Sequence, residues 1–156
     1  MRFFITFVFA LFIAMPLKAG DINAFKRGSL AKIVAQHSGT PFIVSYWSID
    51  CPPCFKELKM WASLSQKFAT LSIILVSTDG MEKQDLVAAT LAELGVTELE
   101  SWVFAESMVE RLRFDIDPHW YGELPRTYFY SKRGEKYGVS GLIQAQQVLT
   151  WMQDNS

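Results

Sequence analysis

The chain has 156 residues, which is enough for one domain of ordinary size. Its 15 basic and 16 acidic residues nearly balance, so the net charge does not indicate the excess of positive charge on which non-specific nucleic-acid binding depends. Half of the residues are hydrophobic, so the chain carries enough apolar side chains for a buried core.

The first 19 residues have the pattern of a secretory signal peptide. One positive charge, Arg2, precedes an apolar run over residues 3–15, and the small residue Ala19 ends the segment. The run is shorter than the ~20 residues that a membrane-spanning helix needs. We therefore predict a signal peptide over residues 1–19 and a periplasmic domain over residues 20–156, which would not be an integral membrane protein after cleavage. An uncleaved N-terminal membrane anchor, with the domain facing the periplasm, is the alternative.

Two elements are predicted at the start of the domain. Residues 29–37 have apolar side chains on one helical face and are followed by a glycine, which indicates a short helix. Residues 42–47 form an apolar run rich in β-branched and aromatic side chains, which is typical of a strand buried on both faces. A buried strand therefore leads directly to the two cysteines of the chain.

Both cysteines lie where this strand gives way to a second helix, predicted to end at about residue 69. A helix start carries partial positive charge and unpaired N–H groups, so an anion is favoured at Cys51, near the N-cap. A free thiol has a pKa near ~8.5, and such positions commonly lower it to roughly 3.5–7.5. Pro52 and Pro53 suit the first turn, where their missing N–H groups cost nothing. Cys51 is thus the predicted nucleophile and Cys54 the resolving thiol.

Two other interpretations of the cysteine pair are weaker. A structural zinc site needs four ligands, and both His37 and His119 lie far from the pair in sequence. A purely structural disulfide between Cys51 and Cys54 would close a very small loop and stabilise the fold little. The order of strand, CxxC motif and helix therefore favours redox chemistry.

Strands and helices alternate after the cysteine helix, and this alternation predicts a parallel core. Asp79, followed by Glu82, is expected to cap the first of these helices. Strands are predicted over residues 71–76 and 102–104, and helices over residues 79–95 and 107–113. A loop is then expected over residues 115–123, followed by a hairpin of two strands, 127–130 and 136–139. An amphipathic helix is expected over residues 145–152.

Residues 41–61, which read PFIVSYWSIDCPPCFKELKMW, resemble the active site of the thioredoxin superfamily. The CPPC form is similar to the exported branch of TlpA/ResA-like thiol–disulfide reductases, and the order of elements resembles this fold across nearly the whole mature chain. The resemblance implies an α/β, thioredoxin-like fold with a central mixed sheet flanked by helices. Residues 97–123 resemble the TlpA-like insertion that precedes the cis-proline strand.

The resemblance also assigns residues to the site. In that family a cis-proline opens the strand that faces the cysteines, and Pro125 matches it. The backbone of Leu124 would then lie beside Cys51, ready to pair with a substrate strand. Trp47 matches the family's tryptophan four residues before the first cysteine. Substrate contacts are expected from Trp47, Asp50, Pro52, Pro53, Leu124 and Arg126.

The chain departs from the family's pattern at four positions. Asp50 replaces a frequent tryptophan, and its carboxylate would raise the pKa of the neighbouring thiol. Ser45 stands where thioredoxin has a buried aspartate, so that proton relay is expected to be absent. Lys59 replaces a helix-kinking proline. Arg126 replaces the usual threonine and is expected to point to solvent rather than to stabilise the thiolate.

The resemblance implies an exported thiol–disulfide oxidoreductase of the protein-disulfide reductase type, with no cofactor. Its expected partners are disulfide-containing exported proteins and a membrane thiol that donates electrons. The alternative is a Sco-like copper-binding assembly protein, because the thiolates of Cys51 and Cys54 with the imidazole of His119 suit Cu(I). Against it, Pro125 stands where a Sco-like site brings its histidine, and two residues rather than three separate the cysteines.

Overall fold

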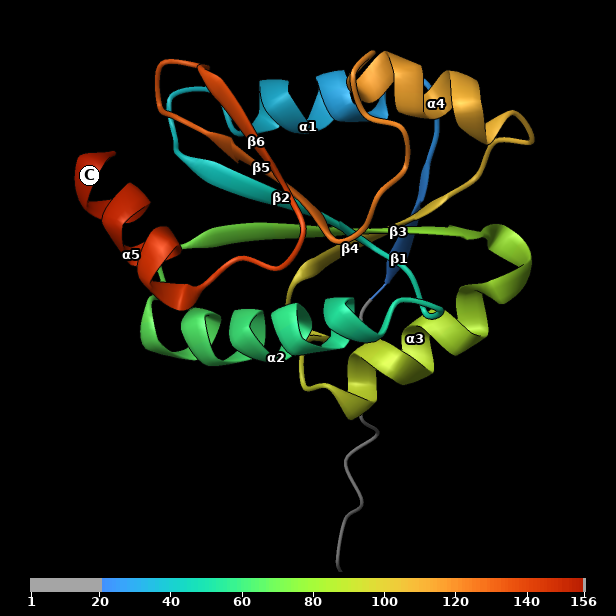
Figure 1. Ribbon diagram of the computed structural model, residues 1–156, viewed down its shortest axis with the longest axis horizontal. Helices are drawn as coiled ribbons and strands as arrows, with labels where there is room; N and C mark the ends of the chain where they lie inside the picture. Colours follow the sequence, from blue (N-terminus) through green and yellow to red (C-terminus); the bar gives the residue numbers. More distant parts are fainter. Residues whose placement is uncertain (1–20, 156) are drawn as a thin grey trace, which may run out of the picture.

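The structure is a computed structural model that describes residues 21–155, and the predicted signal peptide lies outside the described residues (Figure 1). Six strands form one mixed sheet in the order β1-β4-β3-β2-β5-β6. The first four in this order run parallel, and β5 is antiparallel to both of its neighbours. The strands are β1 (Ile22–Phe25), β2 (Phe42–Trp47), β3 (Ser72–Gly80), β4 (Glu100–Phe104), β5 (Arg126–Tyr130) and β6 (Lys136–Ser140).

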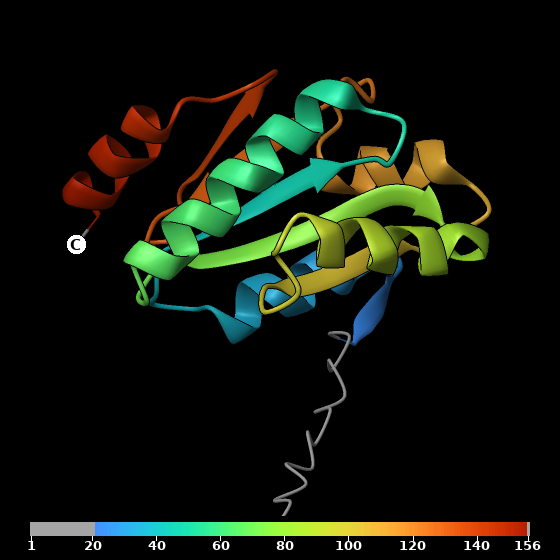
Figure 2. The same ribbon diagram turned by 90° about the horizontal axis from the view of Figure 1, so that it is seen from below.

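Helices cover both faces of the sheet (Figures 1 and 2). One face packs against α1 (Ser29–Gln36) and α4 (Val109–Ile116). The other packs against α2 (Pro52–Lys67), α3 (Gln84–Glu93) and α5 (Ala145–Asp154). This arrangement confirms the predicted α/β, thioredoxin-like fold with a central mixed sheet. Among residues 21–155, no helix combines the length and the apolar character needed to cross a membrane.

Strand β2 divides the interior into two cores. All six of its residues are buried, which confirms the prediction of a strand covered on both faces. Because successive side chains of a strand point to opposite faces, Ile43 and Trp47 join the core under α2, α3 and α5. Val44 and Tyr46 join the core under α1 and α4. The cysteine pair belongs to the first of these cores.

The structure corrects three details of the prediction. β1 was not predicted, because the segment is short and only Phe25 in it is fully buried. Asp79 caps no helix: β3 continues through it, a short 3₁₀ turn η1 (Met81–Lys83) follows, and α3 begins later, at Gln84. Likewise α4 runs on into the expected loop as far as Ile116. The predicted hairpin is confirmed as β5 and β6.

Phe25 secures the edge strand β1 to the second core. Its ring stacks on Phe104 with centroids 5.5 Å apart and meets Tyr46 edge-on at 6.1 Å. We predict that Phe25→Ala lowers the free energy of unfolding by about 3–5 kcal/mol, since it leaves a cavity in a packed aromatic cluster. Urea unfolding measures this loss. The exposed neighbour Lys26 provides the control, and Lys26→Ala should change stability by no more than about 0.5 kcal/mol.

Candidate redox site

The two cysteines are joined in a disulfide at the start of α2, with their Cα atoms 5.3 Å apart. Cys51 is the N-cap residue and Cys54 lies in the first turn, as predicted. Cys51 is 8% exposed and Cys54 only 1%, so a partner molecule reaches the pair through Cys51. These positions fit a nucleophile at the surface and a resolving thiol beneath it.

The two prolines change which backbone groups a thiolate at Cys51 can meet. They occupy the first two helical positions and have no N–H to donate. The N–H of Cys54, which donates to the carbonyl of Cys51 at 2.9 Å, is the first one in the helix. The helix therefore stabilises a thiolate mainly through its dipole rather than through several direct hydrogen bonds.

Pro125 lies at the start of β5, beside the end of β2. The peptide bond between Leu124 and Pro125 is cis, as expected from the resemblance. Strand pairing sets Tyr46 opposite Arg126. The proline, which precedes Arg126, therefore lies at the same end of the sheet at which the chain leaves β2 toward Cys51. Leu124 packs against the core that contains both cysteines.

The other residues expected to contact substrate differ in accessibility. Pro52 and Pro53 are exposed beside Cys51, and Asp50 is exposed just before it. Trp47, by contrast, is 1% exposed and packs in the same core as the cysteines. Trp47 therefore packs in the core with the pair and is not accessible to a substrate. The accessible residues of this set are the two prolines, Asp50 and, in part, Leu124.

Arg126 does not point to solvent, contrary to expectation. Its side chain is 13% exposed, and one terminal nitrogen lies 3.1 Å from Asp117 Oδ2. The other terminal nitrogen lies 2.5 Å from Ser140 Oγ and 3.7 Å from Glu123 Oε1. The insertion supplies both of these carboxylates, so Arg126 ties the insertion to the hairpin of β5 and β6.

A buried carboxyl group that the sequence analysis missed lies one helical turn beyond Cys54. Glu57 is 1% exposed, and its Oε1 accepts hydrogen bonds from Thr127 Oγ1 at 2.6 Å and from Ser45 Oγ at 3.3 Å. Its Oε2 has no partner among the described residues. Burial raises the pKa of Glu57, and interactions with Thr127, with the backbone of Ile143 and with Ser45 oppose this only in part.

Glu57 adds a buried acid that the sequence analysis did not consider when it expected the relay at Ser45 to be absent. Ser45 indeed replaces an aspartate on β2, but it now hydrogen-bonds a carboxyl group that comes from α2 instead. Ser45 Oγ also accepts a hydrogen bond from Trp61 Nε1 at 3.2 Å. The sequence held a signal, because residues three apart share a helix face and Cys54 is buried on that face.

The copper alternative lacks support at its third ligand. The side chain of His119 is 90% exposed, and its Nδ1 lies 3.5 Å from Asp117 Oδ1. Across residues 21–155, no three His, Cys, Asp or Glu side chains gather as a metal site would require. His119 is therefore a surface residue of the insertion in this structure.

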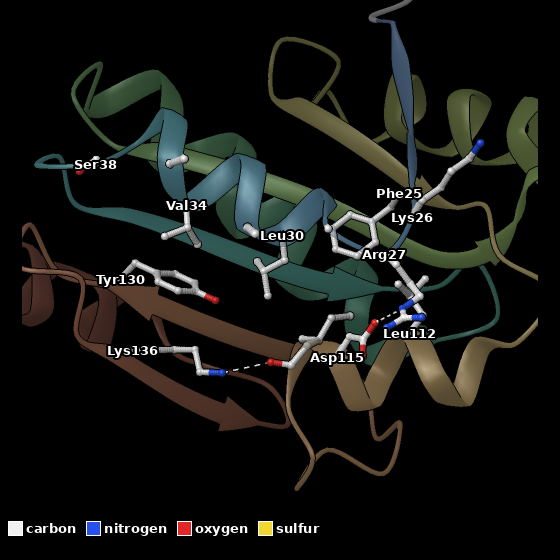
Figure 3. Close-up of a pocket in the computed structure, with 14 residues that line it drawn as sticks. Phe25, Lys26, Arg27, Leu30, Val34, Ser38, Leu112, Asp115, Tyr130 and Lys136 are labelled. Carbon is white, nitrogen blue, oxygen red and sulfur yellow. Dashed lines mark hydrogen bonds and ion pairs between the residues drawn. The ribbon is translucent and has the colours of Figure 1, made fainter.

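A cavity of about 940 Å³ lies on the other face of the sheet, between α1 and α4 (Figure 3). Leu30 and Val34 project from α1 toward Tyr130, as Figure 3 shows. Arg27 at its rim is paired with Asp115 at 2.6 Å. No residue of the core around the cysteines lines this cavity, so it plays no part in the redox site.

The raised pKa of Glu57 predicts a pH-dependent stability. The folded protein binds the Glu57 proton more tightly than the unfolded chain, so the ionised carboxylate opposes folding above the raised pKa. We expect Glu57→Gln to be more stable than the wild type at neutral and mildly alkaline pH. The difference should shrink as the pH falls through the raised pKa and Glu57 becomes protonated.

Urea unfolding of the oxidised protein over a range of pH measures this difference. Glu93→Gln, at the exposed end of α3, removes the same charge without a buried carboxyl group and is the control. A pH-independent difference between Glu57→Gln and the wild type would contradict the prediction.

No protein-family model and no curated protein matches the sequence. Solved structures do match. A secreted Mycobacterium tuberculosis disulfide oxidoreductase homologous to E. coli DsbE has 13% identity, covering 77% of this chain and 85% of its own, with a TM-score of 0.63. A thiol:disulfide interchange protein of the thioredoxin family from Chlorobium tepidum has 14% identity, covering 78% and 83%, with a TM-score of 0.64.

StoA from Bacillus subtilis has 21% identity to the chain, covering 74% of it and 84% of StoA, with a TM-score of 0.54. Likeness at such identities concerns the fold. The chain therefore has the thioredoxin-like fold that is seen in these proteins, and at the start of its α2 it carries a cysteine pair joined in a disulfide.

Proposed function

We propose that the protein is an exported thiol–disulfide oxidoreductase that reduces disulfides in other exported proteins. The observation that carries this proposal is the cysteine pair, whose more accessible member Cys51 caps α2 while Cys54 is almost fully buried. The fold likeness to proteins described as a disulfide oxidoreductase and a thiol:disulfide interchange protein supports it.

The proposed reaction has two sulfur-exchange steps. The Cys51 thiolate attacks one sulfur of a substrate disulfide, a mixed disulfide forms, and the other substrate sulfur leaves as a thiolate. The Cys54 thiolate then attacks the sulfur of Cys51, and this forms the internal disulfide and releases the second substrate thiolate. Two electrons pass to the substrate, so the oxidised protein must be reset by an external dithiol. We assign that role to a membrane thiol donor.

Glu57 is the group we assign to the Cys54 proton. Cys54 is 1% exposed, so solvent alone is a poor acceptor for its proton. The Glu57 carboxyl group is buried one turn further along the same helix face, with Oε2 free of partners among the described residues. The raised pKa of Glu57 is closer to the pKa of a thiol than that of an ordinary carboxyl group is. A smaller difference between the two pKa values favours proton exchange between Glu57 and Cys54.

Export and substrate pairing complete the proposal. The signal-peptide pattern over residues 1–19 supports a periplasmic location, where disulfides persist. The exposed Pro52 and Pro53 next to Cys51, and Leu124, which packs against the same core, are the surface that we assign to a substrate segment. Nothing in the described residues favours the copper alternative, and we do not propose it.

Trapping of substrates tests the roles of the two cysteines. Cys54→Ser leaves the first exchange step intact and removes the second, so exported proteins should accumulate in mixed disulfides with Cys51. Cys51→Ser should trap few or none, because the remaining thiol is buried. Non-reducing gels of periplasmic extracts show the adducts, and mass spectrometry identifies them. Equal trapping by both variants would reverse our choice of nucleophile, and trapping by neither would remove the proposed activity.

The direction of electron flow has its own test. A reductant should equilibrate with glutathione at a potential near about −270 mV, whereas a strong oxidant lies near about −120 mV. We expect the Cys51–Cys54 couple to lie closer to the first value. A potential at the oxidising end would keep the exchange chemistry but reverse its proposed direction.

A further inference from the structure

Two carboxylates and one ammonium group lie beside the loop that leads to the nucleophile. We call Asp50, Asp79 and Lys83 the charge cluster. Lys83 Nζ is 3.1 Å from Asp50 Oδ2 and 3.8 Å from Asp79 Oδ1. The three residues come from different segments, because Asp50 precedes Cys51, Asp79 ends β3 and Lys83 lies in η1.

Asp79 fixes the loop in front of Cys51. Its side chain is 4% exposed, and Oδ2 accepts a hydrogen bond from the backbone N–H of Ile49 at 2.9 Å. Oδ1 accepts another from Ser48 Oγ at 3.0 Å. A buried carboxylate needs such donors and a nearby cation, and Lys83 supplies the cation. Asp79 is thus the buried part of the cluster, and it holds the loop that carries Asp50, the exposed partner of Lys83.

Lys83 and Asp50 act on Cys51 with opposite signs. The carboxylate of Asp50 opposes a negative charge on the adjacent sulfur, and the ammonium of Lys83 offsets that effect. The hydrogen bond and charge of Asp50 raise the pKa of Lys83, so Lys83 stays protonated wherever a cysteine titrates. The sequence alone showed the negative charge of Asp50 next to Cys51 but not the positive charge of Lys83 that is paired with it.

Two other charged side chains, on the elements around the pair, are already engaged. From α2, Glu57 is buried and hydrogen-bonded to Thr127. From β5, Arg126 is held by Asp117 of the insertion. Lys56, two residues beyond Cys54 on α2, is exposed, and Glu82 of η1 interacts with Lys83 through its charge. The charge cluster is thus the set of paired charges at the loop that leads to Cys51.

We propose that Lys83 is a positioning residue that compensates Asp50 and so sets the reactivity of the Cys51 thiol. This inference rests on the proposed redox function of Cys51, but it concerns a property of the thiol that can be measured without any substrate. The expected effect of Asp50, a raised pKa of the neighbouring thiol, stays a prediction, and Lys83 adds an opposing charge to it.

A double-mutant cycle tests the proposal in the Cys54→Ser background, where Cys51 is the only thiol. Lys83→Met should raise the pKa of the Cys51 thiol by about half a pH unit, as expected for a nearby charge screened by water. Asp50→Asn should lower the pKa by a similar amount. The double variant should return close to the wild type, and Lys83→Arg should preserve the wild-type pKa.

The pH profile of alkylation by iodoacetamide, checked by thiolate absorbance, gives each pKa. Below the pKa, Lys83→Met should react about threefold more slowly, since half a pH unit changes the thiolate fraction by that factor. High salt should shrink both single-variant effects, because exposed charges are screened. Lys67→Met is the matched control, because Lys67 is an exposed lysine at the far end of α2, more than about 20 Å from Cys51. This substitution should leave the profile unchanged.

The outcomes separate this inference from the proposed function. An unchanged profile in Lys83→Met, or single-variant effects that do not cancel in the double variant, would overturn the role of Lys83. Loss of substrate trapping with the cycle intact would instead remove the proposed function and leave the charge cluster in place. A fall in melting temperature with no change in pKa would make Lys83 merely structural and would also overturn the inference.

Discussion

The position of β2 at the centre of the sheet is the constraint on which the rest of the structure depends. It pairs with β3 on one side and β5 on the other, and its six residues are buried on both faces. The end of such a strand cannot move without disturbing both cores. Cys51, four residues beyond Trp47, is therefore presented at a fixed edge, next to the start of β5 and the end of β3.

Much of this arrangement follows from local patterns in the sequence. The apolar run of β2, the prolines after Cys51 and the turn between β5 and β6 each specify an element through nearby residues alone. The same reasoning missed β1, because an edge strand with one fully buried residue has almost no pattern of its own. It also placed Asp79 at a helix start, because a capping sequence looks the same whether or not the preceding strand continues.

The parts of the site that could not be predicted depend on contacts between distant segments. Glu57 reads as an ordinary polar helix residue until Thr127, 70 positions later, is seen to donate a hydrogen bond to it. Asp50 reads as an unpaired charge until η1 brings Lys83 to within 3.1 Å. Arg126 reads as a surface residue until the insertion folds over it. In each case the partner determines the chemistry, and periodicity within one segment does not reveal the partner.

The insertion before β5 contributes to the interior as well as to the surface. Its Trp120 is 3% exposed and lies 4.9 Å from Tyr46 of β2, measured between ring centroids. Tyr46 is fully buried, and its hydroxyl has no partner among the described residues. A chain without the insertion would open this aromatic cluster to water and would need a smaller or more polar residue in place of Tyr46. The fit of the central strand in its core therefore depends on a ring that the insertion supplies.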